Sequence, residues 1–188
     1  MTTETEKPPF TPPPTTAAVM PILFVPDPKL RAKAKAVQAA SDIGPLAERM
    51  LATMYRAPGI GLAAPQVGEL LRLVVIDLQE GDKPAPLVLV NPVITAVSRD
   101  MATREEGCLS LPNQFAEVTR PGRVKVAYLD LTGAKREIEG EGLLAACLQH
   151  ELDHLDGVLF VDHLSALKRN MMLRKLAKEL KAKALENE

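Results

Sequence analysis

The feature that most constrains this chain is the pentapeptide at residues 150–154, HELDH, which has the pattern H-E-x-x-H and holds two of the three histidines in the sequence. On a helix, residues four apart lie on one face, about one turn from each other. His150 and His154 can then bind one divalent metal ion, while Glu151 is placed to take a proton from a water molecule. The motif predicts a helix that carries a hydrolytic metal site. The simpler alternative is a solvated helix with incidental histidines.

A catalytic metal needs a third protein ligand, and the identity of that ligand decides the class of enzyme. One protease pattern places a glycine three residues after the second histidine and a third histidine three residues later. Here Gly157 is present, but the ligand position is occupied by Phe160. Other proteases use a downstream glutamate, and the nearest candidate is Glu179, in a basic segment. A zinc endopeptidase with that ligand is the first alternative reading.

The two cysteines offer a different third ligand. A single possible pair in a chain of this length does not predict a disulfide framework. Cys147 lies three residues before the first motif histidine, and we expect it to be a small buried apolar residue. Cys108 lies between Gly107 and a Leu-Ser-Leu-Pro stretch, which indicates a loop or the end of a strand. Its thiolate can complete a Cys/His/His metal site, although a chance loop cysteine is the alternative.

Three segments of the chain carry a family resemblance: residues 59–68 (GIGLAAPQVG), residues 106–110 (EGCLS) and residues 149–154 (QHELDH). In order and approximate spacing they resemble the signature segments of the peptide deformylases, over residues 20–170 of the chain. The resemblance implies an enzyme that removes the formyl group from the initiator methionine of nascent bacterial polypeptides and releases formate. It also implies that Cys108, His150 and His154 bind iron(II), which zinc, nickel or cobalt can replace.

The same resemblance assigns roles in catalysis. We expect Glu151 to carry the proton, and the Gln66 amide with the backbone N–H of Leu109 to hold the developing oxyanion. A turn-capping role is the alternative for Gln66. Glu106 is a candidate for a salt bridge that orients its loop.

Other residues are expected to bind the substrate. Glycines let a backbone approach a ligand closely, so the strand-like segment at Ile60 and Gly61 is a candidate partner for an extended peptide. By resemblance, the backbones of Ile60 and Gly107 pair with that peptide. Phosphate binding by residues 59–68 is not expected, because Ala64 breaks the G-x-G-x-x-G spacing and no Lys-Ser or Lys-Thr follows.

The motif helix predicts the pocket for the methionine side chain. Leu143, Ala146 and Cys147 share a helical face with His150, so they form an apolar wall beside the metal end of that face. Such a wall suits the flexible thioether of methionine. The alternative is that Leu143 and Cys147 merely face the core. The chain departs from well-known members at Phe115, where an arginine is found in some of them. It also departs at Ala146, where a larger aliphatic residue is common and where alanine is expected to widen the pocket.

The local patterns predict an α+β fold, with antiparallel β-sheets packed around a central helix that carries the motif, and a C-terminal helix. Helices are expected at 43–55 with an N-cap at Ser41-Asp42, at 142–155 with a stop at Asp156-Gly157, and at about 164–184. Strands are expected at 71–78, at 87–94 with a bend at Pro92, around 124–128, and at 135–139 as a hairpin partner.

The chain is expected to form one metallohydrolase domain, residues 20–188, after a flexible tail rich in Pro and Thr at residues 1–19. The first residues lack the pattern of a secretory signal, and no apolar run is long enough to span a bilayer. The formal net charge is −1, which gives no bias toward DNA or membranes. We therefore expect a cytoplasmic protein with N-formylmethionyl peptides as substrates and neither DNA nor membrane as a partner.

The C-terminal segment 168–183 is strongly basic. Its cations are Lys168, Arg169, Arg174, Lys175, Lys178, Lys181 and Lys183, and its one acid is Glu179. This pattern is typical of a solvated helix face, and it also suits contact with ribosomal RNA, which the resemblance implies for some members. A non-enzymatic interaction protein that works through this helix is the second alternative reading.

Overall fold

The computed structural model describes residue 13 and residues 15–186. The predicted flexible tail therefore lies mostly outside the described residues. The α-helices are α1 (Gly44–Arg56), α2 (Gly142–Leu155) and α3 (Ala166–Glu186), and the strands are β1 (Gly61–Ala63), β2 (Leu73–Ile76), β3 (Leu87–Val97), β4 (Met101–Cys108), β5 (Leu111–Pro121), β6 (Arg123–Leu129) and β7 (Lys135–Glu141).

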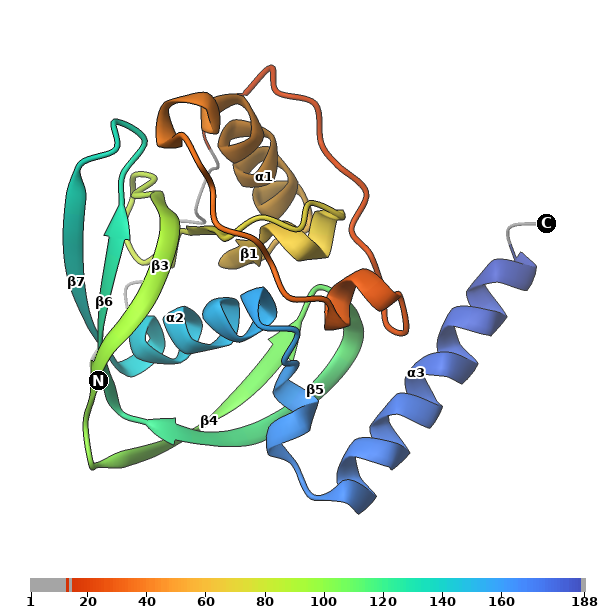
Figure 1. The fold of residues 1–188 in the computed structure, drawn as a ribbon. Helices are drawn as coiled ribbons and strands as arrows, with labels where there is room; N and C mark the ends of the chain where they lie inside the picture. Colours follow the sequence, from red (N-terminus) through yellow and green to blue (C-terminus); the bar gives the residue numbers. More distant parts are fainter. Residues whose placement is uncertain (1–12, 14, 187–188) are drawn as a thin grey trace, which may run out of the picture.

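The strands form two antiparallel sheets, one of five strands in the order β1-β2-β3-β6-β7 and one that is the β4–β5 hairpin. Helix α2 runs through the middle, with the five-stranded sheet on one side and the hairpin on the other, while α3 projects beside β5 (Figure 1). The predicted α+β fold with a central motif helix and a C-terminal helix is confirmed.

Helix α2 has the predicted bounds, and its composition explains its position. Ala145, Leu148, Leu152 and Leu155 are buried against the large sheet, so the helix cannot lie on the surface. The helix ends at the predicted stop, where Gly157 has a φ of +74° that favours glycine.

Helix α1 begins differently from the prediction. The expected N-cap residues Ser41 and Asp42 belong to a preceding 3₁₀ turn, Ala40–Asp42. The N-cap of α1 is Ile43, which makes no side-chain capping bond, and Pro45 lies in the first turn. Proline is favoured in the first turn because its fixed φ suits a helix start. A backbone N–H at that position would have no partner within the helix, so its absence costs nothing.

The strands predicted in the large sheet are confirmed, with β3 longer than expected. Its pairing with β6 shifts register between Val90 and Val93, around Pro92, as a residue without an N–H requires. The β4–β5 hairpin was not predicted, although Cys108 does end a strand as expected. No helix among the described residues is long and apolar enough to cross a membrane.

Candidate active site

The predicted metal ligands come together from two elements. Cys108, at the end of β4, meets His150 and His154 of α2, and their three ligand atoms lie within 4.8 Å of one another. The Cys108 Sγ lies 3.4 Å from Nε2 of His154. Burial holds the pKa of His154 well below its ordinary value, which favours the neutral imidazole that a metal ligand needs. A thiolate with two imidazoles suits iron or zinc.

A buried ion pair fixes one of these ligands. The Nδ1 atom of His150 lies 2.9 Å from Oε2 of Glu106, so Nε2 is the atom turned toward the other ligands. Arg120 of β5 donates to both Glu106 oxygens, at 2.6 and 3.0 Å. Burial alone would raise the pKa of Glu106, but the hydrogen bonds to His150 and Arg120 outweigh it and lower the value to about 2. The carboxylate therefore stays charged and orients the imidazole.

Glu151 lies beside the three ligands and is 5% exposed. Its Oε2 atom has no hydrogen-bond partner among the described residues. Burial raises the pKa of Glu151 to about 7. A buried carboxylate that has one oxygen without a hydrogen-bond partner and a pKa near neutrality can both accept and release a proton.

Gln66 reaches the site from the opposite wall. Its Oε1 accepts the N–H of Ala63 at 2.9 Å, which caps the 3₁₀ turn Ala64–Val67. Its Nε2 donates to Ser110 Oγ at 3.1 Å and lies 3.5 Å from Cys108 Sγ. The capping role is therefore confirmed, and the same turn fixes the amide with its N–H groups toward Cys108 and Ser110.

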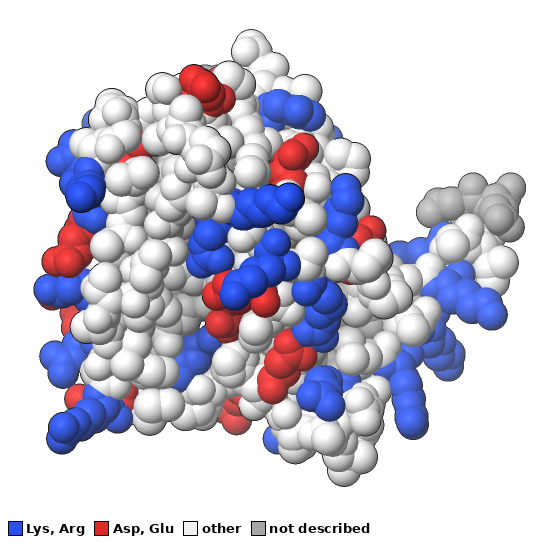
Figure 2. Space-filling model, in the orientation of Figure 1, with Lys and Arg blue, Asp and Glu red and all other residues white. Residues whose placement is uncertain are grey.

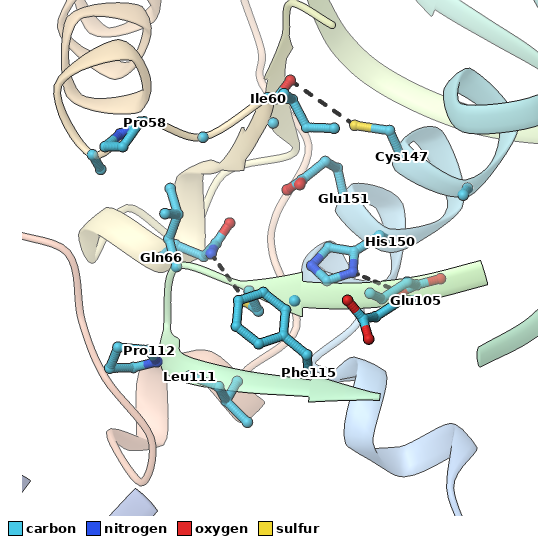
Figure 3. Close-up of a pocket in the computed structure, with 18 of the residues that line it drawn as sticks. Pro58, Ile60, Gln66, Glu105, Leu111, Pro112, Phe115, Cys147, His150 and Glu151 are labelled. Carbon is cyan, nitrogen blue, oxygen red and sulfur yellow. Dashed lines mark hydrogen bonds and ion pairs between the residues drawn. The ribbon is translucent and has the colours of Figure 1, made fainter. Parts of the chain in front are cut away.

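These groups line a pocket of about 580 Å³. Glu151 and His150 reach into it from α2, with Gln66 facing them (Figure 3). All the predicted catalytic and substrate-binding residues line it, namely Gln66, Leu109, Glu151, Ile60, Gly61, Gly107, Leu143, Ala146 and Cys147; of the predicted ligands, Cys108 and His150 do so, while His154 lies deeper at 1% exposure.

The backbone of Ile60 is partly occupied. Its carbonyl accepts the N–H of Asp77 at 2.9 Å and lies 4.0 Å from Cys147 Sγ. A peptide that pairs with Ile60 therefore uses the N–H of this residue or shares its carbonyl.

Several contributors to the site were not predicted. The network around Arg120 extends to Asp153 at 2.8 Å, and Asp153 lies 2.8 Å from Nε2 of His163, the third histidine. Ser110, the partner of Gln66, is fully buried. Arg120 and Glu106 lie on the two strands of the unpredicted β4–β5 hairpin and meet through their side chains, so no local motif signalled the contact. The predicted alternative ligand Glu179 is not in the cluster; it accepts a hydrogen bond from Gln114 at 3.0 Å.

A Cys/His/His cluster with two buried histidines and an adjacent acid, on a helix and a strand end that face a pocket between antiparallel sheets, is typical of a metal-dependent hydrolase. Comparison with known proteins narrows this class. Residues 19–170 match the model of the polypeptide deformylase family. The chain belongs to this family, and it is an amide hydrolase that removes the N-terminal formyl group from nascent polypeptides.

The individual relatives agree with this assignment. A peptide deformylase from Mesorhizobium japonicum is 53% identical over 88% of this chain and 96% of its own length. One from Brucella suis is 52% identical over 86% and 93%. The crystal structure of a peptide deformylase from Legionella pneumophila is 49% identical, superposes with a TM-score of 0.83, and covers 89% of this chain and 98% of that one.

Proposed function

We propose that Cys108, His150 and His154 hold the catalytic metal of this deformylase, and that the native metal is iron(II). The supporting observation is the convergence of their ligand atoms within 4.8 Å. A bound divalent ion supplies Lewis acidity there, which lowers the pKa of water and polarises a carbonyl oxygen. The thiolate–imidazole set accepts iron or zinc, and the family resemblance favours iron.

Glu151 is the proton carrier in this proposal. Glu151 lines the pocket, its buried Oε2 has no hydrogen-bond partner among the described residues, and its pKa of about 7 suits both accepting and releasing a proton. Glu151 takes a proton from the attacking water, whose oxygen bonds to the formyl carbon. It then hands that proton to the leaving amine as the amide C–N bond breaks. Formate and a free N-terminal amine are the products.

Gln66 and Leu109 stabilise the negative charge that develops on the formyl oxygen. The Gln66 amide is held rigidly by Ala63 and Ser110, so it needs no reorganisation as charge develops. Leu109 directly follows Cys108 in the turn of the hairpin and lines the same pocket, which supports this role for its backbone N–H.

The substrate is held from two sides. Leu143, Ala146 and Cys147 form an apolar wall of α2 along the pocket, which accommodates the methionine side chain. The backbones of Gly107 and Ile60, on facing walls, bind the peptide as an added strand, and Gly61 lies beside them.

One experiment tests this proposal against a glutamate-ligated endopeptidase. Anaerobically purified protein is assayed for formate release from a formyl-Met peptide, and metal content is measured in the wild type, in Cys108→Ala and in Glu179→Ala. We expect Cys108→Ala to lose metal and formate release together, while Glu179→Ala keeps both. Retention of metal by Cys108→Ala would overturn the ligand assignment.

The choice of metal has its own test. An open position on iron(II) also admits oxygen, and the cysteine ligand is itself oxidisable, whereas zinc has no redox chemistry. Iron-loaded protein is expected to be more active than the zinc form and to lose activity on aeration. An iron form that stays fully active in air would contradict the assignment.

The basic outer face of α3 is proposed to contact the ribosome, where the nascent substrates emerge in the cytoplasm. Arg174, Lys178 and Lys181 are exposed on this helix, and Figure 2 shows basic side chains along it. Such a row of cations suits the phosphates of RNA. Charge reversal of the three residues should abolish co-sedimentation with ribosomes at low salt while formate release from short peptides persists. Undiminished co-sedimentation would refute the contact.

A further inference from the structure

A second hollow lies beside the active-site pocket, between β5 and α3. This groove of about 640 Å³ is lined by Phe115, Glu117, Lys168, Met171, Met172 and Lys175, among others. None of the proposed metal ligands or catalytic residues lines it. The groove is therefore a separate surface that the proposed mechanism does not use.

The groove is continuous with the active-site pocket. Asn113 and Phe115 line both. Phe115 lies opposite Gly107 in the hairpin, and a β-carbon at Gly107 would lie 2.6 Å from its ring. The ring thus covers the glycine proposed to bind the peptide backbone, and it is itself 61% exposed. A chain that leaves the pocket across Phe115 enters the groove directly.

The α3 wall of the groove is a single helical stripe. Lys168, Met171, Met172 and Lys175 follow i, i+3, i+4 and i+7 spacing, which places them on one face. The neighbouring face, with Leu173, Leu176 and Leu180, packs in the core beneath β5. Met172 also packs against that core, but Met171 is 62% exposed, so the stripe keeps an exposed apolar side chain in the groove. Flexible methionines adapt to varied apolar partners.

The β5 wall offers backbone groups, and the α3 wall offers positive charge. In the described part of the chain, β5 pairs only with β4, so its other edge is available to an added extended strand. Lys168 makes no ion pair with a described residue. The Nζ atom of Lys175 lies 3.9 Å from Oε1 of Glu179, which is a long ion pair. Glu117 is the one acid in the lining, against two lysines. The groove therefore favours an extended, partly apolar ligand with negative charge.

We propose that this groove is an extended substrate site, which binds an acidic, partly apolar stretch of the nascent chain downstream of the formyl-methionine. The inference rests on the proposed function, since it assumes that the peptide leaves the pocket over Gly107 and Phe115. An extended octapeptide spans roughly 26 Å, long enough to occupy pocket and groove together, whereas a tripeptide fills only the pocket.

The test compares kcat/KM for a formyl-Met tripeptide with two formyl-Met octapeptides, which carry either aspartates or lysines at the fifth to seventh residues. The wild type should favour the acidic octapeptide over the basic one by roughly threefold to tenfold, the size expected for one or two exposed ion pairs. The double variant Lys168→Glu with Lys175→Glu should reverse that preference and leave the tripeptide unchanged. The matched control, Lys33→Glu with Lys135→Glu, changes the same charge at exposed sites outside both hollows and should keep the wild-type preference.

The measurements distinguish failure of the proposed function from failure of the extended substrate site. A wild type that cannot process the tripeptide would refute the proposed function itself. Normal tripeptide turnover with equal rates for the two octapeptides would overturn only the extended site. Loss of ribosome co-sedimentation in the groove variant, with its octapeptide preference intact, would assign the groove to the ribosome instead and also overturn the proposal.

Discussion

Gly61 and Glu151 are in direct contact: a β-carbon at Gly61 would lie 2.5 Å from the Oε1 atom of Glu151. The Glu151 carboxylate therefore fits against β1 only because position 61 lacks a side chain. The proposed proton carrier is held between that backbone and the ligand histidine that precedes it.

Gly61→Ala should displace the Glu151 carboxylate and lower kcat by roughly tenfold to a hundredfold, because small errors of position are costly in catalysis. The metal content should not change. Gly44→Ala is the matched control, since a β-carbon there meets nothing within 4 Å. Wild-type turnover in Gly61→Ala would show that the carboxylate tolerates displacement.

Gln66→Glu should lower kcat far more than it raises KM. The carboxylate keeps an acceptor for the N–H of Ala63 but loses the donor that is proposed to stabilise the formyl oxygen. A contact of this kind forms mainly in the transition state, and its loss costs roughly a hundredfold to a thousandfold in kcat. Steady-state kinetics on one formylated peptide measure the two constants. A pure KM effect would move Gln66 from catalysis to substrate positioning.

Glu106→Gln should weaken metal binding by roughly tenfold to a hundredfold, because the charged partner of His150 is lost. It also leaves the buried Arg120 with only the partly exposed Asp153 as a counter-charge, so the variant should unfold at a lower temperature. Metal release to a chelator gives the first value and thermal unfolding the second. Glu48→Gln, an exposed change on α1, should match the wild type in both. Unaltered chelator kinetics in Glu106→Gln would exclude the orienting role.

The Arg31–Asp162 pair should make stability depend on pH in the acid range. Burial raises the pKa of Asp162, but hydrogen bonds from Arg31 and from the N–H of Leu159 prevail and lower it below its ordinary 3.8. A lowered folded-state pKa gives stability that is present above the unfolded pKa and is lost as pH falls through the folded value.

Asp162→Asn should therefore reduce the unfolding temperature at neutral pH, and its difference from wild type should shrink as the pH falls below 3.8. Asp100→Asn, which disrupts a largely exposed pair with Arg123, should show little difference at any pH. A difference for Asp162→Asn that persists unchanged into acid would mean that packing, rather than charge, explains it.

The extent to which sequence predicted this molecule follows from how local each signal is. The motif helix was predicted to its end residues, because its apolar periodicity and the Asp156-Gly157 stop are both local. The β4–β5 hairpin was missed because Met101, Thr103, Arg104 and Glu105 are all exposed, so β4 shows no period-two burial. That strand forms because β5 pairs with it.

The residues of the candidate site likewise fall into those that a local motif signals and those that only the three-dimensional fold brings together. Residue type and loop context made Cys108 a candidate third ligand to the two histidines, and the three family-like segments in order favoured it over a chance cysteine. The link from Arg120 through Asp153 to His163 joins three separate segments by side chains alone, and nothing in the order of residues marks it. Likewise, the meeting of Phe115 with Gly107 depends on hairpin register, which the composition of either strand does not determine.

The most direct test of the account is the turnover of Glu151→Gln with its metal in place. The amide fills the same space beside Gly61 but cannot carry the proton. Metal content should equal that of the wild type, and formate release should fall by roughly a hundredfold to ten-thousandfold, the range for general acid–base catalysis. Near-normal formate release from metal-loaded Glu151→Gln would contradict the central assignment.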